Sequence, residues 1–414
     1  MRRARIRSFL PMAHRATLGT VGESLRSGHR LVALALLVGL SPPQAQAHDP
    51  DVYGGLFRTH DAGANWALIT PGVFASGALA LAASPLDPNH LLLATDSGAW
   101  RSRNGGRDWE AEAPDVLAGP AFAVAFDVGG DRALLAGAAA LFRHDGERWR
   151  PISMPSGAAP ARALVAGASP GRVYLAGRSG LYRSDDWGRS WISVGATLRA
   201  EHVDQVVVRG SPDDVYAVAG GTLWSSSDAG RTWRLRGDSF AGGIEAIGFD
   251  PSDPAGVWAA AGGQTLYSPR PGAAWGIVGT ALPENLARAR ALAISGSTIL
   301  VATDRGLFRS SNAGNRWDPP RENLPAHLIA GVLVPDPRRP ATLFAGFSPK
   351  SYEELRQQLS KPGVVAAASA PRYGSTVLVL AGLLAFGLIA GVLIFSRARS
   401  AARAGRPSIG GAAQ

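Results

Sequence analysis

Two stretches of the sequence, SDDWGRSW at residues 184–191 and SSDAGRTW at residues 226–233, are variants of one motif. Both contain a Ser, an Asp two residues later, a Gly and a final Trp. Ser and Asp side chains accept backbone N–H groups inside tight turns, and Gly adopts a positive φ that other residues resist. The Trp can open the next strand and bury a large surface. The motif therefore predicts a hairpin in which the Asp is structural, not a catalytic acid or a metal ligand.

The Trp that ends this motif recurs along most of the chain. The spacings between successive copies are 43, 40, 42, 42, 42 and 42 residues. The seven positions are Trp66, Trp109, Trp149, Trp191, Trp233, Trp275 and Trp317. Six copies keep an acidic or amide residue at the Asp position: Asp61, Asn104, Asp145, Asp186, Asp228 and Asn312. The copy at residues 268–275 has lost its Asp, and the copy around Asp145 is one residue short.

These motifs resemble Asp boxes, also called BNR repeats. Asp boxes occur in sialidases, xyloglucanases, sortilin-type receptors and photosystem II stability/assembly factor-like proteins. The resemblance covers about 300 residues, from roughly 52 to 347, and the compact blades without insertions are most similar to the photosystem II assembly factor-like group. It implies a β-propeller fold. Because these families perform unrelated functions, it does not define an activity.

The pattern between the boxes also indicates a propeller. In the second repeat, strand signals cover 79–83, 91–95, 99–102 and 109–112, separated by turn residues. A period near 42 residues with four strands is typical of propeller blades. The first repeat begins at its third strand, residues 55–58, and the two missing strands follow the seventh Trp at 329–334 and 342–347. We therefore expect an all-β, seven-bladed propeller over residues 48–347, with blade one closed by both chain ends.

The net charge of +10 is concentrated at the two ends of the chain. Residues 1–47 carry +6 and residues 372–414 carry +5, whereas residues 48–371 carry −1. A neutral body argues against nucleic-acid binding, and basic ends beside apolar runs indicate membrane topology. The apolar run 31–40 followed by Ala45-Gln46-Ala47 predicts a signal peptide over 1–47. An uncleaved anchor is the alternative, but ten apolar residues span only about half of a bilayer core.

A second apolar run, residues 376–395, is twenty residues long and contains no charge. This length matches the hydrocarbon core of a bilayer, and the basic tail 396–414 is expected in the cytoplasm by the positive-inside rule. A buried core helix is the alternative. We expect a single-pass protein of a bacterial-type cell membrane, with the propeller in the periplasm or outside the cell. Residues 348–375 form a tether with a short polar helix at 352–359.

The sequence contains little that indicates catalysis. It has no Cys, its His residues are not paired at metal-ligand spacing, and no cofactor motif is found. We expect a non-catalytic module that binds another protein or a glycan on the outer face of the membrane. The alternative is a sialidase-type exo-glycoside hydrolase, which needs an Arg cluster, a Tyr nucleophile with a Glu partner and an acid/base Asp. The acidic doublets Asp185-Asp186 and Asp213-Asp214 are interpreted as solvated turns.

Aligned first strands predict one candidate site. In a propeller these strands line the central channel, and five consecutive repeats place an ionisable residue at one position. The residues are Arg162, Asp204, Glu245, Arg290 and His327, whereas the second and third repeats offer Gly77 and Phe122. We expect an arc of alternating charge at one channel mouth. Convergent polar groups beside apolar surface make this arc a candidate partner-binding site. The favoured interpretation is a neutral channel in which Arg162 pairs with Asp204 and Glu245 pairs with Arg290, because exposed ion pairs are common. The Arg that follows the third-strand aromatic in five repeats is expected to be solvated or to bridge blades (Arg58, Arg101, Arg143, Arg183 and Arg309).

Overall fold

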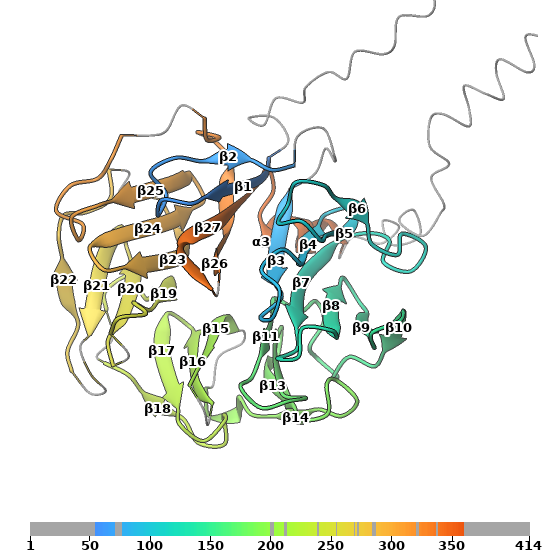
Figure 1. Cartoon of the computed structure of the whole chain (residues 1–414). Helices are drawn as coiled ribbons and strands as arrows, with labels where there is room; N and C mark the ends of the chain where they lie inside the picture. Colours follow the sequence, from blue (N-terminus) through green and yellow to red (C-terminus); the bar gives the residue numbers. More distant parts are fainter. Residues whose placement is uncertain are drawn as a thin grey trace, which may run out of the picture. The chain divides into compact units, whose positions relative to one another are not determined.

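The computed structural model describes residues 54–359, apart from 71–76, 199–202, 211–212, 238–239, 254, 269, 271–272, 284–286, 320–322 and 337. Its strands form seven antiparallel sheets that are arranged in a ring, as Figure 1 shows. This confirms the all-β, seven-bladed propeller that the repeats predict.

The blades follow one another along the chain. Blade 2 contains β3 (Ala78–Ala83), β4 (Leu91–Thr95), β5 (Gly98–Ser102) and β6 (Glu110–Ala111). Blade 3 contains β7 (Ala121–Phe126), β8 (Ala133–Gly137), β9 (Leu141–His144) and β10 (Trp149–Ile152). Blade 4 contains β11 (Ala163–Ala166), β12 (Val173–Gly177), β13 (Gly180–Ser184) and β14 (Ile192–Ser193), followed by the 3-10 turn η1 (Ala196–Leu198). Blade 5 contains β15 (Val203–Arg209), β16 (Asp214–Ala219), β17 (Thr222–Ser226) and β18 (Arg234–Leu235). Blade 6 contains β19 (Ala246–Gly248), β20 (Val257–Ala261), β21 (Gln264–Ser268) and β22 (Gly276–Val278). Blade 7 contains β23 (Ala289–Ser295), β24 (Thr298–Thr303) and β25 (Gly306–Ser310).

Blade 1 takes two strands from each end of the propeller. Its order is β2 (Ala67–Leu68), β1 (Gly55–Thr59), β27 (Arg339–Ser348) and β26 (Ile329–Asp336). The buried rings of Phe57 and Phe347 pack edge to face across the junction, with centroids 5.3 Å apart. This arrangement closes the ring, because β1 from the start of the propeller pairs with β27 from its end.

Blade 7 differs from the expectation of four strands in every repeat. Among the described residues of this blade, no strand follows Trp317. The N–H of Asp318 still donates to the carbonyl of Arg309 at 2.8 Å, as a fourth strand would. The next residue is Pro319, which has no N–H to continue the ladder. The strand prediction was therefore wrong for this blade.

The Asp boxes form the turn that the motif predicts. In the box of blade 5, Ser226 Oγ accepts the N–H of Gly230 at 2.8 Å, and Asp228 Oδ1 accepts the N–H of Thr232 at 2.8 Å. Gly230 has a φ of 82°, and the hydroxyl and backbone N–H of Thr232 lower the pKa of Asp228 to about 2. The boxes of blades 1, 2, 4 and 7 repeat both backbone bonds.

The box Trp residues pack between neighbouring blades. Trp233 is 7% exposed and belongs to the core between blades 4 and 5. Its Nε1 donates to the carbonyl of Gly230 in its own box and to that of Val194 in the preceding blade. Trp109 makes the equivalent pair of bonds to Gly106 and Ile69. Each of these Trp residues therefore joins two sheets by packing and by a hydrogen bond.

The third-strand Arg residues also join blades. Arg58, Arg183 and Arg309 donate to box carbonyls of the following blade, those of Gly105, Ala229 and Ala62 respectively. Arg101 instead binds the carboxylate of Glu112 with two N–H groups and contacts His90. These four Arg residues are therefore not simply solvated. Three of them bridge neighbouring blades, and Arg101 forms an ion pair with Glu112.

One of the two acidic doublets is not a solvated turn. The side chain of Asp213 is fully buried, although its position in a turn predicted exposure. It accepts the hydroxyl of Tyr174 at 2.8 Å and the N–H of Ala168 at 2.7 Å, both from blade 4. Asp185 lies at the surface, where it pairs with Arg172 and Arg183. Asp213 is therefore buried against blade 4, and the sequence around Asp213 does not reveal this contact.

The helix predicted at 352–359 is present as α3 (Tyr352–Leu359). Within residues 54–359, as far as they are described, no helix has the length and apolarity needed to cross a membrane. The predicted signal peptide 1–47, membrane helix 376–395 and tail 396–414 lie outside the described residues.

Candidate binding site at the channel mouth

The first strand of every blade carries a β-bulge near its start. A register shift marks the extra residue in blades 1, 2, 3, 5 and 7. In blades 4 and 6, the N–H groups of Arg162 and Glu245 donate to Ala176 and Ala260, which already pair with the next residue of the strand. The seven bulge residues are Gly331, Leu79, Phe122, Arg162, Asp204, Glu245 and Arg290, in the order of blades 1 to 7. A bulge turns its residue out of the regular pleat. Six of the seven line one pocket at the mouth of the channel.

Four of the five ionisable residues that the sequence alignment predicts occupy the bulge position. Arg162, Asp204, Glu245 and Arg290 occupy equivalent bulges, and Phe122 is also placed correctly. His327 is wrong, because it is exposed and precedes β26, whose bulge residue is Gly331. Gly77 is wrong by two residues, because the bulge of β3 is at Leu79. Spacing from the box Trp gives the correct bulge residue in blade 2, because Leu79 follows Trp66 by 13 residues, as Phe122 follows Trp109. In blade 1 the bulge residue Gly331 follows Trp317 by 14 residues.

The arginines of the arc are held by different partners. Arg162 donates through Nε to the carbonyl of Asp204 at 3.0 Å, and its Nη2 lies 3.5 Å from the Asp204 carboxylate. The predicted pair of Glu245 with Arg290 is not formed. Glu245 accepts the N–H of Ala289 at 2.8 Å, and burial raises its pKa. Arg290 instead binds Glu353 of α3 at 3.1 Å.

Helix α3 lies on the channel mouth, which the sequence did not predict. The carboxylate of Glu353 also binds Nη1 of Arg162, at 3.0 Å, so it bridges blades 4 and 7. Burial opposes its charge, but the guanidinium groups of Arg290 and Arg162 outweigh burial and lower the pKa of Glu353 to about 2. The ring of Tyr352 packs edge to face on Phe122 and lies over the guanidinium of Arg162.

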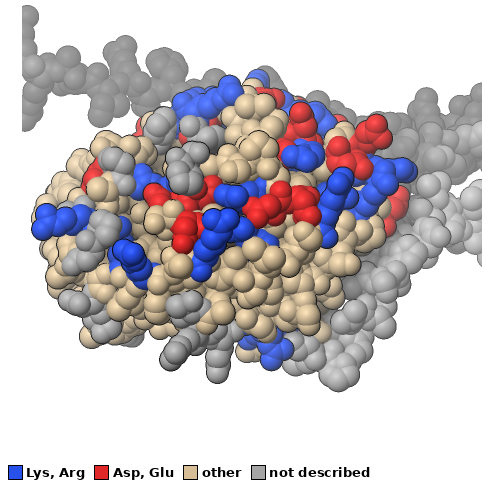
Figure 2. Space-filling model, turned by 90° about the horizontal axis from the view of Figure 1, so that it is seen from below, with Lys and Arg blue, Asp and Glu red and all other residues tan. Residues whose placement is uncertain are grey.

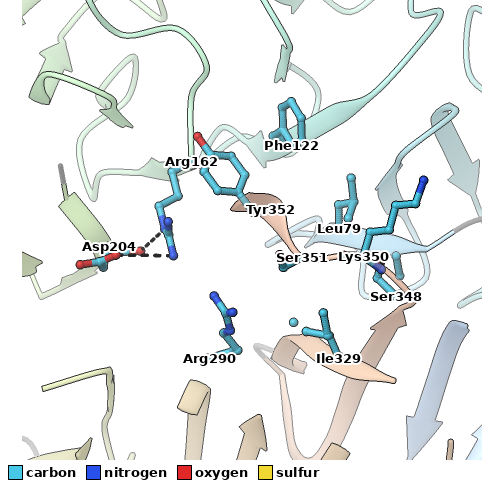
Figure 3. A pocket seen from close by; sticks show the side chains of 12 residues that line it. Leu79, Phe122, Arg162, Asp204, Arg290, Ile329, Ser348, Lys350, Ser351 and Tyr352 are labelled. Carbon is cyan, nitrogen blue, oxygen red and sulfur yellow. Dashed lines mark hydrogen bonds and ion pairs between the residues drawn. The ribbon is translucent and has the colours of Figure 1, made fainter. Parts of the chain in front are cut away.

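A pocket remains beside the helix. Its volume is about 160 Å³, and Figure 3 shows Tyr352 between Phe122 and Arg162, with Arg290 and Ile329 below Tyr352. A second cavity of about 180 Å³ on the same mouth is lined by Arg178, Arg288, Glu353 and Arg356 among others. The mouth thus combines convergent cationic groups with an apolar wall formed by Leu79, Phe122 and Ile329.

A larger cavity, of about 400 Å³, lies further along the channel between β15, β19, β23 and β26. Its lining is mostly aliphatic, and the sequence analysis did not identify it. Arg209 and Asp336 are polar residues of this lining, and the guanidinium of Arg209 lies 4.4 Å from the ring centre of Phe249.

The side of the ring seen in Figure 2 carries acidic and basic side chains intermingled in one band, without a field of one sign. This distribution agrees with the net charge of −1 for residues 48–371. In the part of the chain that the structure describes, no group of three or more His, Asp or Glu residues could hold a metal ion.

The fold is similar to that of solved propellers with different sequences. No protein-family model and no curated protein matches the chain. Among solved structures, YCF48 from Cyanidioschyzon merolae has a TM-score of 0.53 at 18% identity, over 67% of this chain and 97% of that chain. YCF48 bound to a D1 peptide has a TM-score of 0.51 at 16% identity, over 65% of this chain and 93% of that chain.

A third similar structure is the extracellular domain of a putative hybrid two-component system, BT4673, from B. thetaiotaomicron. Its TM-score is 0.51 at 12% identity, over 70% of this chain and 39% of that chain. These likenesses confirm, at the level of fold, the resemblance to the photosystem II assembly factor-like group that the Asp boxes indicate.

Proposed function

We propose that the chain is a non-catalytic propeller that binds another protein outside the cytoplasm and is anchored by the apolar segment 376–395. The observation that carries the proposal is the channel mouth, where bulges from six blades place charged and apolar side chains around one pocket. Convergent polar groups beside apolar surface are what a binding site needs. The similarity in fold to YCF48, which has been solved with a bound D1 peptide, supports a peptide or protein as the ligand class.

The tyrosines weigh against the alternative of a sialidase-type hydrolase. Such an enzyme needs a Tyr nucleophile with a Glu partner. The hydroxyls of Tyr174 and Tyr267 donate to Asp213 and Asp253. Those of Tyr182 and Tyr352 donate to the backbone carbonyls of Ser156 and Pro160. An activity screen on sialyl and β-glucan substrates tests this alternative, and turnover of either substrate would replace the binding proposal.

The two Lys residues of the chain allow a direct test of the binding proposal. Lys350 lines the mouth pocket, and Lys361 follows α3 by two residues. A membrane-impermeant, amine-reactive crosslinker added to intact cells should therefore join a bound partner to the chain beside the mouth. The captured protein should bind again to the purified full chain, and Asp204→Ala with Arg290→Ala should weaken this binding.

The control for this experiment is Lys350→Arg with Lys361→Arg, which keeps both charges and removes both reactive amines. Loss of the crosslink in this variant shows that it forms at the mouth. If the partner binds the Asp204→Ala and Arg290→Ala protein with unchanged affinity, the arc is only structural. The loops around Arg178 and Asp304-Arg305 would then be the next surface to test. If no captured protein binds again, the proposed function is wrong.

A further inference from the structure

The carboxylate of Glu353 occupies a site that the propeller itself builds. Arg162 and Arg290 come from blades 4 and 7, and both guanidinium groups point at this one carboxylate. Their side chains are only 20% and 16% exposed. The two guanidinium groups are partly desolvated, and the carboxylate of Asp204, 3.5 Å from Arg162, offsets only part of their charge, so an anion between them is favoured. The mouth without α3 would therefore be a carboxylate site.

Helix α3 buries fewer side chains against the propeller than a core strand does. The helix has eight residues, of which Leu355 is the one classed as buried. Tyr352 adds the ring contacts with Phe122 and Arg162, whereas Glu354, Gln357 and Gln358 are exposed. A helix this short is marginal in water on its own. Its docking thus depends mainly on Tyr352, Glu353 and Leu355.

The site is also incompletely filled by α3. Nε of Arg290 is buried and has no hydrogen-bond partner among the described residues, so α3 does not satisfy every donor of this guanidinium. The pocket of about 160 Å³ lies next to Tyr352 and is walled by Leu79, Phe122 and Ile329. The pocket leaves room for a ligand that makes more contacts than α3 does.

We propose that the channel mouth binds an acidic segment of a partner protein, an aromatic residue followed by Glu or Asp, and that α3 occupies this site in cis until the partner displaces it. This inference rests on the proposed function in that the partner is a protein. In the docked helix, Tyr352 is the aromatic residue and Glu353 the acidic residue that occupy this site. Binding of the partner and docking of α3 exclude each other, so the affinity for the partner is set partly by how tightly α3 is held.

The test uses the full chain and a peptide of residues 349–359 (PKSYEELRQQL) as the probe. Because the chain has no Cys, Gln357→Cys accepts a single nitroxide label on the exposed side of α3. Glu353→Gln should increase the mobile component of the label's spectrum. Glu354→Gln is the matched control, since it removes the same charge from the same helix but leaves Glu353 in place. The peptide, labelled with fluorescein, should bind the Glu353→Gln protein more tightly than the wild type.

Two further variants test the chemistry of the site. A peptide with Gln in place of Glu353 should bind at least about tenfold more weakly, which corresponds to about 1.4 kcal/mol. Arg290→Gln in the Glu353→Gln protein should lower the affinity for the original peptide to the same extent, with an unchanged melting temperature as the control for folding. Equal mobility of the label in the Glu353→Gln and Glu354→Gln proteins would overturn the proposal. So would equal peptide affinity of the wild-type and Glu353→Gln proteins. Neither outcome affects capture of a partner through Lys350, so the two proposals fail separately.

Discussion

At the scale of single residues, the Asp box works through acceptors, not through acidity. Asp228 accepts the N–H and the hydroxyl of Thr232, and Asn312 in blade 7 accepts the N–H of Arg316 in the same way. The residue before the box Gly has a positive φ in these turns, as at Ala229 (58°) and Ala313 (55°). The turn therefore holds two successive left-handed residues, of which the sequence motif reveals only the Gly.

Asp228→Ala and Asp228→Asn should therefore differ in their effect on the free energy of unfolding. Asp228→Ala should lower the free energy of unfolding by roughly 1–3 kcal/mol, because turn donors lose their acceptor. Asp228→Asn should cost clearly less, because the amide oxygen can accept the same backbone N–H, as in the natural boxes with Asn104 and Asn312. Urea unfolding of the three proteins measures both values. Equal losses for Ala and Asn would show that the charge, and not the acceptor, stabilises the turn.

At the scale of elements, each blade is an antiparallel sheet whose neighbours supply the rest of its core. The buried cluster around Trp233 takes residues from blades 4 and 5, and that around Trp66 takes residues from blades 7 and 1. Blade 1 depends most on distant parts of the chain, because β1 pairs with β27 along five residues, from Gly55 with Phe347 to Thr59 with Leu343.

Deletion of residues 329–347 should therefore destabilise the whole ring. The deletion removes β26 and most of β27, so that β1 and β2 lose the rest of their sheet and the edges that remain can pair with other molecules. We expect a lower melting temperature and oligomers in size-exclusion chromatography. A monomeric protein with an unchanged melting transition would contradict the shared blade.

At the scale of the whole molecule, stability depends on several groups whose pKa values the fold shifts away from their ordinary values. Burial raises the pKa of Asp61 and Asp186, but hydrogen bonds outweigh it and lower each of these pKa values to about 2. At Asp228, hydrogen bonds likewise outweigh burial and lower the pKa to about 2. The paired arginines outweigh burial in the same way at Glu353. Burial, followed by the charge of Arg101, lowers the pKa of His90 to about 4. Glu245 has the opposite shift, because burial raises its pKa.

The sign of the pH dependence follows from these shifts. A carboxylate with a lowered folded pKa contributes stability above its unfolded pKa, near 4, and loses it as the pH falls towards 2. His90 binds its proton more readily in the unfolded chain, so it also destabilises the fold as the pH falls from about 6.5 to 4. We expect the melting temperature to fall steadily below about pH 6.5. Asp61, Asp186 and Asp228 should each contribute under about 1 kcal/mol to this pH dependence after solvent screening. A melting temperature that is constant between pH 7 and 3 would contradict this.

The sequence by itself determined the number of blades, the box turns, the closure of blade 1 and the four charged bulge residues. The box motif and its strands repeat at nearly equal spacing, so each copy supports the structural interpretation of the other copies. The tertiary structure alone decided that Asp213 is buried under blade 4, that Arg290 turns to α3 and not to Glu245, and that the fourth strand of blade 7 is missing. The position of α3 belongs to the same group, since Glu353 is 191 residues from Arg162 in the chain. Contacts of this kind occur once, between segments far apart in sequence, and they depend on the closed ring bringing blades 3, 4 and 7 around one opening, which no local pattern of residues records.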